Sequence, residues 1–433
     1  MDAHTCTMRR HPAPAFDVFN VFFERIYDPS IHLVLSFDGR LDEDALETAT
    51  ERLIAANPYL SSRFRVVDGR PVWEEIPADA REQAFFIDRS GRDPLADHPP
   101  PLDVRTAPQV RVRLSRNADG DTLTLTIHHG FCDAAGLATL ARDLLACYRG
   151  ILANPCHTPP STGAYDRSTD RIPVPACDDG PSGGDAAPFV DRWRFPVERT
   201  GRGAPRILSR TLAPDRLARI RAWAKEHGAT VNDVLIGAFF LALLRIRDDP
   251  SDRNAPRGIL TSADMRRALP DPAACPPMNL SIAFELTLEV PDGAGLADII
   301  GEITAVTTRC KAGAFWRDCI SFYEDLLSRG MPAVEAFFDG MIERYHTSGQ
   351  KNPVFSNLGV IDEAALLPVP GRDGIPLSLR DVRFIPCVCW PYGFLAIAAT
   401  YRDRLTLTTA VEEGPYSPDT VERFLRYMDG YLP

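Results

Sequence analysis

A stretch rich in proline, glycine, aspartate and serine, from about residue 153 to residue 205, constrains the fold of this chain most strongly. A segment of that composition has no apolar periodicity with which to bury one face, so we expect a connection that crosses the surface. With 433 residues, the chain is also too long for one ordinary hydrophobic core. We therefore predict an N-terminal lobe over residues 1–160, an inter-lobe connection over 161–205 and a C-terminal lobe over 206–433.

The N-terminal lobe begins with patterns typical of a strand, a helix and a hairpin. Residues 31–38 carry an apolar side chain at every second position, which predicts a strand with one buried face. Apolar residues then recur at helical spacing over 42–57, and Pro58 ends that helix. Asp68 and Gly69 separate two short apolar runs and indicate a hairpin.

A second hairpin follows over residues 110–127, and a helix over 137–148 comes after it. In the C-terminal lobe the patterns predict further strands and helices without strict alternation. The predicted strands lie near 259–260, 282–286, 394–400 and 405–410, and the predicted helices over 217–224, 234–246, parts of 296–346 and 420–428. Mixed order of this kind favours an α+β fold with mixed sheets over a Rossmann fold.

The second hairpin ends in two adjacent histidines, His128 and His129. Successive strand residues point to opposite faces of a sheet, so His129 continues the apolar row that ends at Ile127, and His128 continues the threonine row. His129 is therefore the histidine that we expect to face an interior cleft. A neutral imidazole in that position can take a proton from an alcohol or an amine as it attacks a carbonyl.

Asp133 lies four residues after His129, in the turn that should follow the strand. Its carboxylate could orient the imidazole or fix the loop through an ion pair. A histidine and an aspartate at this spacing also occur together by chance, and the chain has nine histidines. The pair alone is therefore a weak indicator of catalysis.

Residues 128–133, HHGFCD, resemble the HHxxxDG signature of a superfamily of acyl-transferring enzymes. That superfamily contains nonribosomal peptide condensation domains, polyketide-associated acyltransferases, wax ester synthases and alcohol acetyltransferases. Other blocks resemble it in the same order, over about residues 16–430. They are the opening strand and helix with LSSRF at 60–64, ATVNDVL at 229–235, SADMRR at 262–267 with Met278-Asn279, and FSNLGVID at 355–362.

The resemblance implies two lobes, each like chloramphenicol acetyltransferase, that form a pseudo-dimer around a central tunnel. The C-terminal lobe would contribute a crossover segment near residues 353–372. A thioester donor would enter the tunnel from one face and the acceptor from the other. No cofactor or metal is implied as a resident group, because the donor, an acyl-coenzyme A or an acyl-phosphopantetheine carrier, is a substrate.

The same resemblance implies roles for particular residues. His129 would be the general base, and Asp133 would be mainly structural, with Arg266 as its expected partner and His128 in a supporting position. Asn279, Ser356 and Asn357 would lie near the tunnel, where polar groups could position substrate or stabilise the tetrahedral oxyanion. No covalent enzyme intermediate is implied.

One position departs from the signature, because Ala134 stands where the family has glycine and the next glycine is Gly136. A turn with positive φ at residue 134 would strain an alanine. We therefore expect either a shifted turn or a reaction that has drifted from standard acyl transfer.

Net charge and hydropathy limit the possible partners. The formal net charge of -11 argues against general binding of nucleic acid or an anionic membrane. No N-terminal segment resembles a signal peptide, and the longest apolar run, over 236–244, is too short to span a bilayer. We expect a cytoplasmic protein, and a monomer.

The expected function is transfer of an acyl group from a coenzyme A or carrier-protein thioester to a hydroxyl or an amine, in secondary metabolism. A hydroxyl acceptor is slightly favoured, because no carrier or adenylation domain is attached, and the acidic charge mildly disfavours an acidic carrier protein as donor. Two alternatives stay open: a condensation-like enzyme repurposed for cyclisation or epimerisation, and a non-catalytic module that binds a carrier-bound substrate.

Three groups of residues have both a functional and a structural interpretation. Phe315, Trp316, Phe337 and Phe338 could line an acceptor pocket, although core packing is commoner for such aromatics. Arg202, Arg206 and Arg210 could meet a phosphate, but a solvated charged face is the usual role of such residues. The cysteines lack metal or redox spacing and are expected to be buried thiols.

Overall fold

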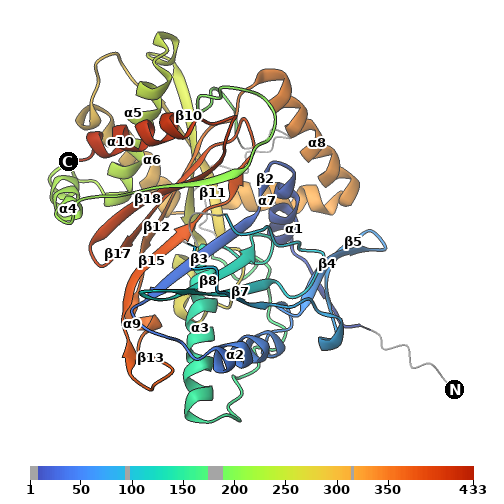
Figure 1. The fold of residues 1–433 in the computed structure, drawn as a ribbon. Helices are drawn as coiled ribbons and strands as arrows, with labels where there is room; N and C mark the ends of the chain where they lie inside the picture. Colours follow the sequence, from blue (N-terminus) through green and yellow to red (C-terminus); the bar gives the residue numbers. More distant parts are fainter. Residues whose placement is uncertain (1–7, 93–97, 174–188, 314–315) are drawn as a thin grey trace.

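The computed structural model describes residues 8–92, 98–173, 189–313 and 316–433, and two large sheets organise it (Figure 1). The first sheet has five strands, and its neighbours are antiparallel except for the last pair. In spatial order the strands are β15 (Leu379–Ile385), β3 (Ser30–Phe37), β8 (Gly120–His128), β7 (Val110–Asn117) and β6 (Phe85–Asp88). Four of them come from the N-terminal part of the chain.

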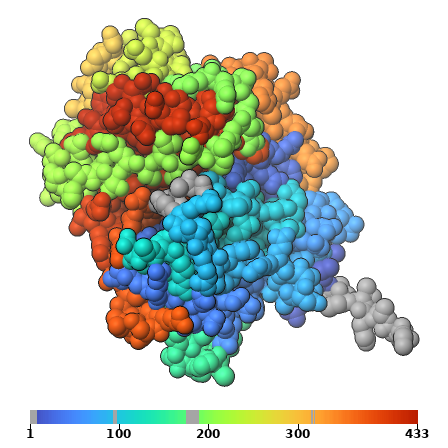
Figure 2. All heavy atoms as spheres, viewed as in Figure 1, coloured from blue at the N-terminus to red at the C-terminus, as the bar shows by residue number. Residues whose placement is uncertain are grey.

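The second sheet has six strands from the C-terminal part, and it mixes parallel with antiparallel pairs. In spatial order they are β11 (Ser281–Glu289), β10 (Pro256–Asp264), β12 (Val354–Val360), β17 (Leu395–Tyr401), β18 (Arg404–Glu412) and β9 (Pro205–Thr211). In the space-filling view the blue and cyan N-terminal residues fill most of the lower half, and orange residues of the C-terminal part extend down beside them (Figure 2).

The remaining strands form small sheets. They are β1 (Arg10–Pro12), β5 (Arg70–Glu75) and β4 (Ser62–Val67) in one sheet, β16 (Val388–Cys389) with β2 (Tyr27–Asp28), and β13 (Val369–Pro370) with β14 (Pro376–Leu377). The α-helices are α1 (Ala15–Phe22), α2 (Glu43–Ala56), α3 (Ala134–Ala153), α4 (Arg216–Glu226), α5 (Val231–Arg247), α6 (Leu296–Lys311), α7 (Trp316–Ser328), α8 (Met331–Ser348), α9 (Glu363–Leu366) and α10 (Pro418–Tyr431).

Strand β8 is buried along its whole length, because β3 and β7 pair with it on both sides. Leu125 lies opposite Leu33, and Ile127 opposite Ile31, so the alternation in both strands stacks apolar side chains on one face. This register carries the end of β8, and the two histidines, to a defined place beside β3.

Helix α5 is the central helix of the C-terminal part, and its residues from 234 to 244 are buried. A capping box begins this helix: the Asp233 N–H donates to Thr230 Oγ1 at 3.3 Å, and the Thr230 N–H donates to Asp233 Oδ2 at 2.8 Å. Among the described residues no single helix is long and apolar enough to cross a membrane; α4 and α5 meet that test only jointly, across a 101° bend.

The α+β class and the predicted hairpins are confirmed, and two details differ from expectation. The described part of the inter-lobe connection contains no helix or strand before β9 begins at Pro205, but it is not wholly on the surface, since Arg167, Trp193 and Phe195 are buried. The strand that crosses into the first sheet is β15, which begins beyond the predicted crossover range of 353–372, whereas β12 lies within that range and in the second sheet. The predicted lobe boundaries stay a prediction.

Candidate active site

A cavity of about 800 Å³ lies where the two large sheets and four helices meet. Residues of β3, β15, β10, β11, β12 and β17 line it together with residues of α1, α7 and α8 and the first residue of α3. Most of the lining side chains are apolar or aromatic. A cavity of this size and character suits a small organic molecule or a flexible chain.

His129 lines this cavity immediately beyond the end of β8. Its backbone N–H donates to the Pro29 carbonyl at 2.8 Å, which continues the pairing of β8 and β3 by one residue. The side chain is half-buried, and its Nδ1 atom is buried with no hydrogen-bond partner among the described residues. The imidazole therefore lies at the wall of the cavity, and its Nδ1 atom makes no hydrogen bond to the described residues.

His128 lies outside the cavity lining and is completely buried. Its Nδ1 accepts a hydrogen bond from the Gly130 N–H at 2.9 Å, and its Nε2 lies 4.0 Å from Glu24 Oε2. Burial, with the neighbouring His129 and Arg105, lowers the pKa of His128 to about 3. His128 is thus a neutral side chain that supports the turn after β8.

Asp133 caps the N-terminus of α3 and is buried. One carboxylate oxygen accepts the Gly136 N–H at 3.0 Å, and the other accepts the Leu280 N–H at 2.8 Å and Arg266 Nη1 at 2.8 Å. Burial raises the pKa of Asp133, but Arg266 and the two backbone donors outweigh burial and hold that pKa below its ordinary value. The ion pair that the sequence led us to expect is present.

Asn279, together with Arg266, holds the histidine turn in place from the C-terminal part of the chain. The Asn279 side-chain amide donates to the His129 carbonyl at 2.9 Å and to the Gly130 carbonyl at 3.2 Å. Arg266 also donates to the Met278 carbonyl at 2.6 Å. The segment between β10 and β11 therefore contacts both ends of the histidine turn. Asn279 binds the turn at His129, and Arg266 binds it at Asp133.

A buried arginine from the inter-lobe connection makes another contact to this turn. Arg167 donates to both carboxylate oxygens of Asp17, at 2.7 and 2.9 Å, and to the Phe131 carbonyl. Its guanidinium also lies 4.9 Å from the centre of the Tyr59 ring. No local pattern in the sequence identifies Arg167, because its partners are distant in the chain.

Ala134 is the first residue of α3 and adopts no positive φ. The strain considered for an alanine at this position is therefore absent, since the turn ends at Asp133 in an extended conformation. Gly136 serves a packing role, because a Cβ there would lie 2.7 Å from Cys132 Cβ. The Ala134 methyl group instead borders the cavity.

No protein-family model matches the chain. Among curated proteins it is 29% identical to Tyrocidine synthase 3 of Brevibacillus parabrevis over 126 residues, which is 28% of this chain and 2% of that synthase. It is 22% identical to the phthiocerol/phthiodiolone dimycocerosyl transferase of Mycobacterium leprae over 299 residues, 64% of this chain and 69% of the transferase. The chain thus spans a very small part of the synthase and about two thirds of the transferase.

Solved structures resemble the chain over nearly its whole length. The first condensation domain of the CDA synthetase matches with a TM-score of 0.66 and 17% identity, over 98% of this chain and 97% of that domain. The chain has the condensation-domain fold. Two other proteins share this fold: the trichothecene 15-O-acetyltransferase from Fusarium sporotrichioides (TM-score 0.65, 14% identity, 98% and 94% coverage), and the epimerization domain from the third module of tyrocidine synthetase B (0.61, 14%, 98% and 96%).

The remaining predicted site residues occupy different places in this condensation-domain fold. Ser356 lines the cavity, and its hydroxyl lies 2.9 Å from that of Ser262, another lining residue. Asn279 and Asn357 lie outside the lining, and the Asn357 side chain accepts the Gly359 N–H at 3.0 Å. The structure thus brings His129 and Ser356 to one cavity, with Asp133 at its edge.

Sequence reasoning missed the aromatic wall of the cavity. Phe16, Phe19 and Phe23 line it from α1 and the residues just beyond. Their spacing of three and four residues is helical and would have predicted this face. Of the aromatics proposed as pocket residues, Phe337 lines the cavity, whereas Trp316 and Phe338 are core residues; Phe315 lies outside the described residues.

Two cysteines that line the cavity, Cys387 and Cys389, do not have the properties of nucleophiles. Burial raises the pKa of the Cys389 thiol to about 11 and that of Cys387 well above its ordinary value, so both stay protonated at neutral pH. Within the part of the chain that the structure describes, no three metal-ligating side chains are grouped.

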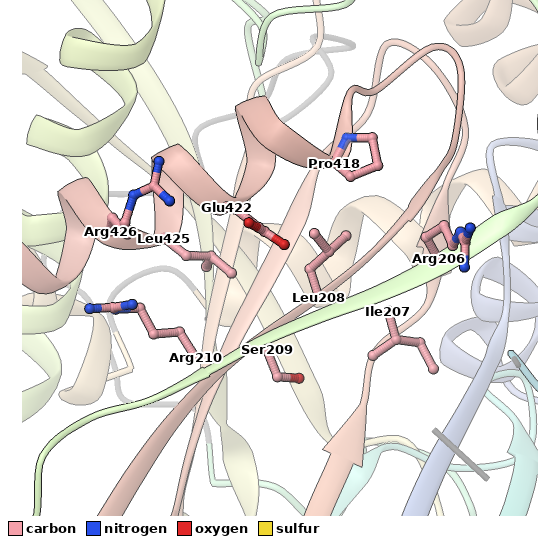
Figure 3. A pocket seen from close by; sticks show the side chains of 9 residues that line it. All are labelled: Arg206, Ile207, Leu208, Ser209, Arg210, Pro418, Glu422, Leu425 and Arg426. Carbon is pink, nitrogen blue, oxygen red and sulfur yellow. The ribbon is translucent and has the colours of Figure 1, made fainter. Parts of the chain in front are cut away.

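A second hollow of about 480 Å³ lies between β9 and α10 (Figure 3). Arg206 and Arg210 line it, and each pairs with a carboxylate of its own chain: Arg206 with Glu413 at 2.6 Å and Arg210 with Asp429 at 2.5 Å. Arg202 pairs in the same way with Glu412. These pairs favour a solvated charged face, and not a phosphate site, as the role of the three arginines.

The low pKa of His128 predicts how stability depends on pH. The unfolded chain binds a proton at His128 near pH 6.5 and the folded chain only near pH 3, so acidification between these values favours unfolding. In His128→Asn, whose amide oxygen can still accept the Gly130 N–H, the unfolding midpoint should fall less steeply over this window than in the wild type. Urea denaturation at several pH values measures this difference. Equal slopes for the two proteins would mean that His128 is not a buried neutral group.

Proposed function

We propose that the chain is an acyltransferase and that the cavity beside His129 is its active site. The observation that carries the proposal is that the second histidine of the HHGFCD segment lies at the wall of a large, mainly apolar cavity. Asp133, Arg266 and Asn279 hold the turn on which that histidine lies. A general base has to be held this way, because proton transfer depends on its distance from the acceptor.

In the proposed reaction, His129 Nε2 takes the proton of the acceptor hydroxyl, since Nδ1 is buried. The freed electron pair of the acceptor oxygen forms a bond to the thioester carbonyl carbon, and the carbonyl electrons move to oxygen. The tetrahedral intermediate then collapses, the carbon–sulfur bond breaks, and the leaving thiolate takes the proton back from the imidazolium. The products are an ester and a free thiol, and His129 returns to its neutral form.

The oxyanion of this intermediate needs hydrogen-bond donors. Ser356 and Ser262 line the cavity, and their hydroxyl groups can rotate toward a developing charge. Asn279 is a poor donor for this purpose, because its amide already donates to two backbone carbonyls. We assign the oxyanion contact to Ser356 and a loop-holding role to Asn279.

The donor in this proposal is a coenzyme A or carrier-protein thioester, and the acceptor is a small molecule with a hydroxyl or an amine. The aromatic side chains from α1 and α8 suit an apolar group of considerable size. An acetyltransferase shares this fold, and a dimycocerosyl transferase is similar in sequence, which supports acyl transfer.

Incubation of the protein with acyl-coenzyme A donors of several chain lengths and a panel of apolar alcohols and amines tests the proposal. Mass spectrometry of the acylated product, with free thiol measured in parallel, should show one thiol released for each product formed. The epimerization domain that shares this fold raises the alternative, and a change of substrate configuration or ring closure without release of thiol would support it. If substrate binds to the cavity and stays chemically unchanged with every donor tested, the chain is a binding module and not an acyltransferase.

A further inference from the structure

The lining of the cavity includes a buried positive charge. Lys351 lies between α8 and β12, lines the cavity, and has a relative exposure of 6%. Its Nζ donates to the Tyr345 hydroxyl at 3.1 Å and lies 4.4 Å from the centre of the Tyr345 ring. No carboxylate of the described residues lies within 4.0 Å of this ammonium group to form an ion pair.

A buried ammonium group without an ion-pair partner is costly, because the lost hydration is not replaced. Lys351 has three N–H donors, and Tyr345 accepts one of them. Asp191 is the acidic residue among those lining this part of the cavity, and one of its oxygens accepts the Asn352 N–H at 2.6 Å. Burial lowers the pKa of Lys351, but Tyr345 and the charge of Asp191 outweigh burial and raise that pKa. Lys351 is therefore charged, and no carboxylate of the described residues lies within ion-pair distance of its ammonium group.

The surroundings of Lys351 differ from the rest of the cavity wall. Arg344 adds a second, exposed positive charge to the lining, and Ser348 and Gln350 add polar side chains. The lining also includes the aromatic side chains of Phe16, Phe19 and Phe23. The cavity thus combines a largely apolar lining with two positively charged side chains.

From this arrangement we infer that Lys351 binds an anionic group, a carboxylate or a phosphate, of the molecule that occupies the cavity. The inference rests on the proposed function and adds a substrate class to it. The apolar body of the ligand would lie against the aromatic wall, and its anion would accept hydrogen bonds from Lys351 Nζ and from the Tyr345 hydroxyl.

Binding measurements with matched probes test this inference without any acyl transfer. Dodecanoate and dodecanol differ only in the anion, and phosphopantetheine and pantetheine differ only in the phosphate. By calorimetry, wild-type protein should bind one anionic probe at least about tenfold more tightly than its neutral partner. Lys351→Met should lose that preference without weaker binding of the neutral probe, and Lys351→Arg should keep most of it.

The probe pair that shows the preference identifies the source of the anion, a carboxylate substrate or the donor phosphate. Lys311→Met, which removes an amine outside the cavity, is the matched control and should keep the preference. Lys351→Met should fold, because methionine has the length of the lysine stem and removes a buried charge; its thermal unfolding midpoint verifies this.

Equal binding of both members of each pair to the wild type would overturn the inference, as would the same preference in Lys351→Met. Neither result would affect the proposed function, because transfer activity and its dependence on His129 are measured separately. Conversely, an anion preference that depends on Lys351 would stand even if no acyl transfer were found.

Discussion

Arg266→Met is expected to lower the free energy of unfolding by about 3–5 kcal/mol, which is the usual cost of removing one partner of a buried ion pair. Arg266 and Asp133 are both buried, and their charged atoms lie 2.8 Å apart. Methionine fills much of the same volume but leaves the Asp133 carboxylate with only the Gly136 and Leu280 backbone donors. The uncompensated charge, and not a lost attraction alone, makes this effect large.

Urea denaturation measures this cost, and a double variant shows its origin. Asp133→Asn combined with Arg266→Met removes both charges, so it should be more stable than Arg266→Met alone. Arg219→Met removes one partner of the exposed pair between Arg219 and Asp215 and should change stability very little. A double variant that loses at least as much stability as the two single variants added together would contradict this account of the pair.

Much of the fold is predictable from the sequence, because its signals are local. The alternation in residues 31–38 and 121–127 needs only the neighbouring residues of the same strand, and both strands are present as β3 and β8. The capping box at Thr230 and Asp233 likewise depends on four consecutive residues. Such patterns predict the structure well because burial of the apolar face directly stabilises the strand or helix that carries it.

Contacts between distant segments were not predictable in this way. Strand β15 joins β3 across more than three hundred residues of sequence, and Arg167 reaches Asp17 from the inter-lobe connection. The buried charge of Lys351 has no local signature either, since its burial depends on Tyr345, Gly393 and the rest of the cavity wall. These features depend on the packing of the two lobes, which no single segment encodes.

The candidate site contains residues that local sequence patterns predict and residues that they do not predict. Strand alternation distinguishes His129 from His128, and the structure places only His129 in the cavity lining. The expected pairing of Asp133 with Arg266 came from a family resemblance and not from periodicity, because 133 residues separate the partners. The resemblance implied that Asn279 lies near the tunnel, where it could contact substrate. Its amide instead donates to the backbone of the histidine turn, and Asn279 does not line the cavity.

His129→Ala is expected to reduce the rate of acyl transfer by about 10²- to 10⁴-fold, the usual contribution of a general base. The reason is that no other imidazole lines the cavity among the described residues, and the lining cysteines are protonated. The backbone contacts of His129 to Pro29 and Asn279 do not involve its side chain, so the variant should fold. His227→Ala, which removes an exposed histidine stacked on Trp223, is the matched control and should keep full activity.

The measurement that tests the central claim most directly is the single-turnover rate of acyl transfer, with donor and acceptor both saturating, in the wild type and in His129→Ala. Saturation removes any effect of weaker binding, so the rate reports the chemical step alone. We predict a rate at least about a hundredfold lower in His129→Ala, with the same stoichiometry of thiol to product. An unchanged single-turnover rate in a folded variant would contradict the assignment of His129 as the base.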